Sequence, residues 1–179
     1  MKPFAITAAA GLMLMSTSAF AQDALSGTEA DAMYAVDTAT FVKLVTSSNE
    51  FEIQSSELAE EKGQSEHVKE VAAQIIADHT KAAGDLAAAL EAAGETAPPE
   101  PPVLSPKHED MIALLEGAEG EKFEMLYVDM QAVAHMEAVS LFQTFAKGGD
   151  NETVKAFAAE TLPTLVMHLE HVKEIIAAE

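Results

Sequence analysis

Apolar side chains recur at helical spacing along four long segments of the chain, and this periodicity is the feature that most limits the fold. Glycines, a proline-rich stretch and capping serines bound these segments, as expected at the ends of helices. No stretch of any length shows the alternation of a β-strand. The spacing therefore predicts long helices over about 38–62, from Ser65 to before Gly94, over about 121–147, and from a cap at Asp150 or Asn151 onward.

The connections between these segments predict how the helices are arranged. The turn at Gly63–Gln64 and the break at Gly148–Gly149 are short, so each joins antiparallel neighbours. Between the two helix pairs, prolines favour an extended chain over 95–105, and Ser105-Pro106 then starts a short helix to about Glu116. The sequence thus predicts an all-α, ferritin-like four-helix bundle, with a long crossover that carries a short extra helix between helices two and three. A plain up-and-down bundle is the alternative.

The N-terminal residues have the order of a secretory signal peptide. Lys2 precedes an apolar run over 4–15, and Ala19-Phe20-Ala21 forms a cleavage motif before Gln22. The run is too short for a transmembrane span, so an uncleaved anchor is the weaker hypothesis. We therefore expect a signal peptide over 1–21, a flexible mature N-terminus over 22–37, a bundle domain over 38–179, and a periplasmic or secreted protein with no integral membrane segment after cleavage.

The charge balance excludes several classes of partner. The chain has 30 acidic residues and 10 lysines, no arginine, and a formal net charge of −20. Such a charge disfavours nucleic acid and anionic lipid surfaces. The chain also has no cysteine, which excludes disulfides and thiolate metal ligands. No segment identifies a protein partner.

Four ionisable side chains lie near the midpoints of the four long segments, one on each. They are Glu52, His79, Glu137 and His168, and helical phase places each within or beside the apolar stripe of its segment. Buried charge is costly unless it is paired, hydrogen-bonded or bound to a metal. The pattern therefore predicts a metal site with these four ligands. Asp78 and His135 lie nearer the stripe edges and are predicted as outer or alternate ligands.

Imidazole and carboxylate ligands suit iron, manganese, zinc or copper, which favours a protein that stores, buffers or senses such an ion. Met136 beside His135 and Met167 beside His168, together with Met130, leave a cuprous or silver site as a variant hypothesis. The alternative is a metal-free polar network that fixes the register of a structural or stress-related, partner-binding bundle. The sequence contains no pairing of nucleophile and base, so we do not predict an enzyme.

Five short motifs together resemble a known bacterial family, domain of unknown function 4142. They are SNEFEI at 48–53, Asp78-His79, Tyr127-Val128, AHMEA at 134–138, and the stretch from Leu162-Pro163 to His168-Leu169. The resemblance covers about residues 38–176. It implies an exported protein of the ferritin-like superfamily and no established activity.

Ferritin-like di-iron proteins carry Glu-x-x-His on two of their helices. Here the positions three residues before His79 and His168 are Ile76 and Leu165. Both glutamates are therefore missing, which makes a di-iron oxidase the third and least favoured hypothesis.

Overall fold

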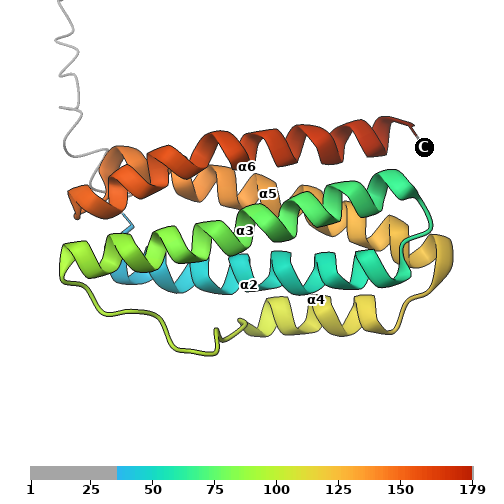
Figure 1. Cartoon of the computed structure of the whole chain (residues 1–179), viewed down its shortest axis with the longest axis horizontal. Coiled ribbons are helices and arrows are strands. Elements are labelled where there is room, and N and C mark those ends of the chain that lie inside the picture. The colour runs from blue at the N-terminus through green and yellow to red at the C-terminus, as the bar shows by residue number, and fades with distance from the viewer. Residues whose placement is uncertain (1–35, 179) are drawn as a thin grey trace, which may run out of the picture.

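The computed structural model describes residues 36–178, and all regular secondary structure in that range is helical. The predicted signal peptide and nearly all of the predicted flexible N-terminus lie outside the described residues. Five helices follow one another along the chain (Figure 1): α2 Thr38–Lys62, α3 Glu66–Ala93, α4 Pro106–Glu116, α5 Gly120–Gly148 and α6 Glu152–Ala178. The prediction of four long helices and one short one is confirmed.

The helix ends follow from local side-chain chemistry. Ser65 and Ser105 accept hydrogen bonds from the third amide of their helices, and Pro106 occupies the first turn of α4, as predicted. Gly94 ends α3 in the left-handed conformation, with φ 69°. Gly63 ends α2 differently, because its φ is −58° and an added Cβ would lie 2.5 Å from the Ala59 carbonyl oxygen. That glycine is needed for close approach and not for backbone handedness.

The four long helices form a closed ring in cross-section. Helix α2 packs on α3, α3 on α6, α6 on α5, and α5 on α2, while α4 lies outside the ring against α2 and α5. The crossover, residues 95–105, leads from the end of α3 back along the bundle to α4 (Figure 1). This is a helical bundle, and the finer assignment to the ferritin-like class stays a prediction. Within residues 36–178, no helix is both long and apolar enough to cross a membrane.

Two apolar clusters fill the two ends of the bundle. One contains Phe51, Ile75 and Tyr127, and the other contains Phe41, Leu90 and Phe145. Between them lies a layer of buried polar side chains, which we call the polar layer: Glu52, Ser55, His79, Gln131, His135 and His168. The bundle is therefore apolar at both ends and polar in the middle, where the sequence predicts its site.

Candidate metal centre

Three imidazoles from three helices meet in the polar layer. His79 lies on α3, His135 on α5 and His168 on α6, and their exposed fractions are 5%, 0% and 1%. Each can offer one ring nitrogen such that all three nitrogens lie within 4.8 Å of one another. Neutral imidazole is a common ligand for zinc and copper. We call this group the histidine cluster.

The outer nitrogen of each imidazole contacts a hydrogen-bond acceptor. His135 Nδ1 lies 3.0 Å from the backbone carbonyl oxygen of Gln131, and His168 Nε2 lies 2.9 Å from Asp78 Oδ2. His79 Nδ1 lies 3.0 Å from Asn49 Oδ1. Because all three partners accept, each outer nitrogen carries the proton and donates. Each ring therefore presents an unprotonated nitrogen on its inner side, which is how proteins orient histidines that bind metals.

The inner nitrogens of the three imidazoles do not form favourable hydrogen bonds with one another. His135 Nε2 and His168 Nδ1 face each other at 3.3 Å, and with the outer nitrogens protonated both present lone pairs. His79 Nε2 is buried and has no hydrogen-bond partner among the residues described. Opposed lone pairs repel unless a cation lies between them. The histidine cluster therefore has the electrostatics of an acceptor for a positive ion.

Protonation of one of the imidazoles does not easily provide this positive charge near neutral pH. Burial, followed by the proximity of the other two imidazoles, lowers the pKa of His79 well below its usual value. Burial also lowers the pKa of His135 to about 4, with His168 adding to this effect. The pKa of His168 is lowered by burial as well, although Asp78 opposes the change. All three imidazoles are therefore ready to bind a metal without first losing a proton.

Glu52 lies on the outer side of the histidine cluster. Its side chain is 1% exposed, and Oε1 is 3.6 Å from His135 Nδ1, the nitrogen that already donates to Gln131. Burial raises the pKa of Glu52 to about 8, and the Gln131 amide opposes this rise. Glu52 and His135 are consequently both neutral near pH 7, so their contact is not an ion pair. Neither Glu52 oxygen has a hydrogen-bond partner in the part of the chain that the structure covers.

The prediction that Glu137 projects into the core is wrong. Its side chain is 58% exposed and pairs with Lys107 at the N-terminal end of α4. Successive residues of a helix are about 100° apart, so His135 and Glu137 point to nearly opposite sides of α5. His135, predicted as an alternate ligand, points into the core in place of Glu137. Asp78, also predicted as an outer ligand, holds His168 in orientation.

The comparisons with known proteins place the chain in a family. Residues 23–175 match the family described as "Domain of unknown function (DUF4142)". The protein belongs to this family. Its resemblance to the family, inferred above from five motifs, is thereby confirmed. No curated protein matches the sequence.

The fold of this DUF4142 protein is similar to that in a crystal structure of a DUF305 fragment from Deinococcus radiodurans. The two chains share 16% sequence identity with a TM-score of 0.66, and the similarity covers 78% of this chain and 94% of that chain. At this identity the similarity shows the fold alone.

Sequence reasoning missed two of the three residues that orient the imidazoles in this DUF4142 protein, Asn49 and Gln131, and predicted the third, Asp78. Asn49 and Gln131 are uncharged, and a single amide side chain on a helix is not marked by hydropathy as a site residue. Gln131 is fully buried, and its side-chain amide donates to Ser55 Oγ over 2.9 Å. One signal was available in the sequence: Asn49 lies one helical turn before Glu52, and Gln131 lies one turn before His135.

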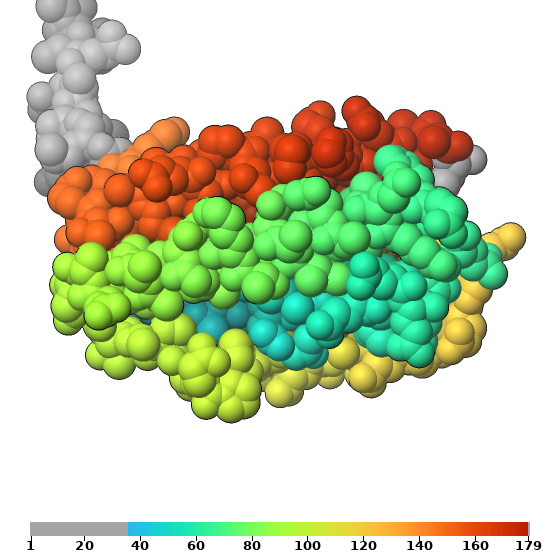
Figure 2. Space-filling view, viewed as in Figure 1, coloured from blue at the N-terminus to red at the C-terminus, as the bar shows by residue number. Residues whose placement is uncertain are grey.

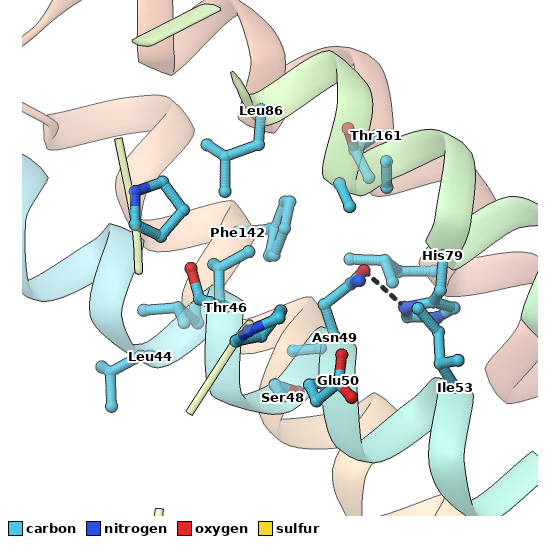
Figure 3. A pocket seen from close by; sticks show the side chains of 18 of the residues that line it. Leu44, Thr46, Ser48, Asn49, Glu50, Ile53, His79, Leu86, Phe142 and Thr161 are labelled. Atoms are coloured by element: carbon cyan, nitrogen blue, oxygen red, sulfur yellow. Dashed lines mark hydrogen bonds between the residues drawn. The ribbon is translucent and has the colours of Figure 1, made fainter. Parts of the chain in front are cut away.

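A cavity of about 620 Å³ adjoins the histidine cluster. His79, His168 and Asp78 contribute to its wall, and His135 does not. Figure 3 shows His79 bonded to Asn49 on one side of this space, with Leu86, Phe142 and Thr161 around it. An ion in the histidine cluster would therefore lie beside a cavity large enough for a small molecule.

Proposed function

We propose that this protein binds one transition-metal ion through His79 Nε2, His135 Nε2 and His168 Nδ1, and that it stores, buffers or senses that ion. One observation carries the proposal: the outer nitrogen of every imidazole in the histidine cluster faces an acceptor, which leaves three inner nitrogens for one ion. A histidine that only fills the core needs no such orientation.

The donor set favours zinc or copper over manganese. Three neutral imidazoles suit Zn²⁺ and Cu⁺, whereas manganese prefers carboxylate ligands. The exposed fractions of Met136 and Met167 are 50% and 37%, so these thioethers do not support a mixed histidine–methionine site. The missing glutamates before His79 and His168 argue against a di-iron oxidase.

The alternative function is a structural or stress-related bundle whose polar layer is a metal-free network. Such a network stabilises a core only when its members are satisfied. Five buried side-chain atoms in the described residues have no partner, and His79 Nε2, which an ion in the histidine cluster would satisfy, is among them. This incomplete network supports the metal hypothesis over the alternative.

Export to the periplasm or beyond is part of the proposal, and it is supported by the order of residues 1–21. Sequencing the N-terminus of protein recovered from a bacterial periplasmic fraction tests it. We expect the mature chain to begin at Gln22.

A metal titration tests the central proposal. The mature chain, produced without a polyhistidine tag and stripped with chelator, is titrated with Zn²⁺ and, under anaerobic reducing conditions, with Cu⁺. We expect one ion per chain and a loss of roughly hundredfold or more in affinity for His79→Gln. His67→Gln is the matched control, because His67 also lies on α3 and its side chain is 58% exposed. Equal affinities for His79→Gln and the unmodified chain would contradict the proposal.

A further inference from the structure

The cavity beside the histidine cluster has an apolar body. Its walls come from α2, α3, the crossover, the start of α4, α5 and α6. Small side chains on α3, Ala82, Ala83 and Ala87, leave the space open, while Leu86, Phe142 and Leu165 make its surface apolar. On the face shown in Figure 2, α2 lies recessed between α3 and the crossover. The crossover therefore covers one side of the cavity.

One end of the cavity is chemically different from the rest. His79 and His168 form part of the wall there, and His79 Nε2 is a buried nitrogen without a hydrogen-bond partner in residues 36–178. Three imidazoles leave one position open on a tetrahedral ion. Two of the three proposed ligands line the cavity, so we place the open position of the ion on the cavity side.

The charges around the cavity restrict what it accepts. Four carboxylate side chains line it, Glu50, Asp78, Glu100 and Glu137, against a single lysine, Lys107. Lys107 is already paired with Glu137. An anionic head group would therefore meet net negative charge at the wall, whereas an uncharged ligand would not.

We infer that the cavity binds a small apolar molecule that carries one uncharged nitrogen heterocycle, whose lone pair occupies the fourth position of the ion. This inference rests on the proposed metal site. A dative bond from the ligand nitrogen to the ion is the only bond formed, and the apolar part of the ligand packs against α3 and α5. Nitrogen donors suit zinc and copper, and an uncharged donor avoids repulsion by the acidic wall.

The test uses 4-phenylimidazole, imidazole and phenylacetate as probes of the zinc-loaded mature chain. We expect 4-phenylimidazole to bind roughly tenfold or more tightly than imidazole, because its phenyl ring leaves water for the apolar wall. Phenylacetate has a similar apolar body with an anionic head, and we expect it to bind more weakly than 4-phenylimidazole. Removing zinc with a chelator should also weaken 4-phenylimidazole binding roughly tenfold or more.

Variants that fill the cavity provide a second test of the inference. Ala82→Leu places a larger side chain one turn from His79 and should weaken 4-phenylimidazole at least about tenfold. The matched control is Ala88→Leu, the same change on α3 at an exposed position that does not line the cavity. Thr161→Leu on α6 is a second filling variant, two turns from His168, for the case in which Ala82→Leu alters zinc uptake.

The two proposals fail in different ways. Zinc uptake is measured before any probe is added, and its absence would overturn the metal site and this inference together. Normal zinc uptake with 4-phenylimidazole binding no tighter than imidazole, or unchanged in both filling variants, would overturn the inference and leave the metal site standing. Binding of phenylacetate as tight as that of 4-phenylimidazole would also overturn it.

Discussion

Glu52→Gln tests whether a carboxyl group in the polar layer stays protonated in the folded protein. Glu52 is 1% exposed, and burial raises its pKa from 4.5 to about 8. Glutamine keeps nearly the same shape but does not titrate. The variant should therefore differ from the unmodified protein in how its stability depends on pH, and the metal-free protein is the form to compare.

The sign and size of this pH dependence follow from the linkage between protonation of Glu52 and folding. Between pH 4.5 and about 8, the unfolded chain releases the Glu52 proton and the folded chain keeps it. The free energy of unfolding therefore falls as pH rises, by about 1.36 kcal/mol per pH unit. From pH 4.5 to pH 7 this amounts to about 3 kcal/mol. Below pH 4.5 the carboxyl is neutral in both states and has no such effect.

The assay is urea unfolding of the chelator-treated protein at pH values from 4.5 to 7.5. The amide of Glu52→Gln adds a buried donor, which costs about 1–3 kcal/mol at every pH. The decisive quantity is therefore the change with pH of the stability difference between variant and unmodified protein. We expect Glu52→Gln to gain about 3 kcal/mol relative to the unmodified protein between pH 4.5 and pH 7.

Glu137→Gln is the matched control, because the same change falls on a side chain that is 58% exposed. Its stability difference should stay within about 0.5 kcal/mol at all pH values. A stability difference for Glu52→Gln that is equally flat with pH would refute the reasoning, since it would mean that Glu52 ionises in the folded protein as it does in the unfolded chain.

Three further predictions concern the crossover, Pro163 and the imidazoles. Limited proteolysis should cut within 95–105 before any long helix, because this segment is largely exposed, and early cleavage inside α5 would contradict the fold. Pro163→Ala should stabilise the protein by about 1–3 kcal/mol in urea melts, because it restores a backbone donor in α6, and it should leave zinc affinity within about twofold since Pro163 does not line the cavity. A clear loss of zinc affinity would instead give Pro163, which lies inside α6, a role in shaping the site. As pH falls from 6.5 toward 4, the chelator-treated unmodified protein should lose stability relative to His135→Gln, because unfolding lets His135 take up a proton. The opposing contribution of Glu52 is common to both proteins and cancels in this difference, so identical acid profiles of the two proteins would refute the prediction.

The helices could be predicted from the sequence because their boundaries are marked by local chemistry. Serine caps, Pro106 and the glycines between segments act within a few residues and need no tertiary information. His79 and His168 could be placed in the core for a related reason. Large apolar residues lie one turn away on the same face, Ile75 before His79 and Leu165 before His168, and both are buried.

The inward face of α5 could not be predicted in the same way. In the sequence, the apolar residues of α5 follow a stripe that passes through Val133 and Glu137. In the structure, Val133 is 44% exposed. The buried positions beside the histidine cluster are Gln131, Ala134, His135 and Ala138, which are small or polar. Hydropathy identifies the buried face of a helix by its large apolar side chains. It therefore predicts the wrong face for α5, whose buried residues beside the histidine cluster are small or form hydrogen bonds. Asp78 could be predicted as an outer ligand, but its pairing with His168 and the pairing of Asn49 with His79 join different helices and emerge only from packing.

The most direct test of the metal centre is a crystal structure of the mature chain grown with Zn²⁺, with diffraction data collected on both sides of the zinc absorption edge. We predict one anomalous peak inside the bundle, about 2.0–2.1 Å from His79 Nε2, His135 Nε2 and His168 Nδ1. Glu137 should remain outside, beside Lys107. A zinc-saturated crystal whose anomalous peaks all lie on surface carboxylates or on His171, with the histidine cluster empty, would contradict the account.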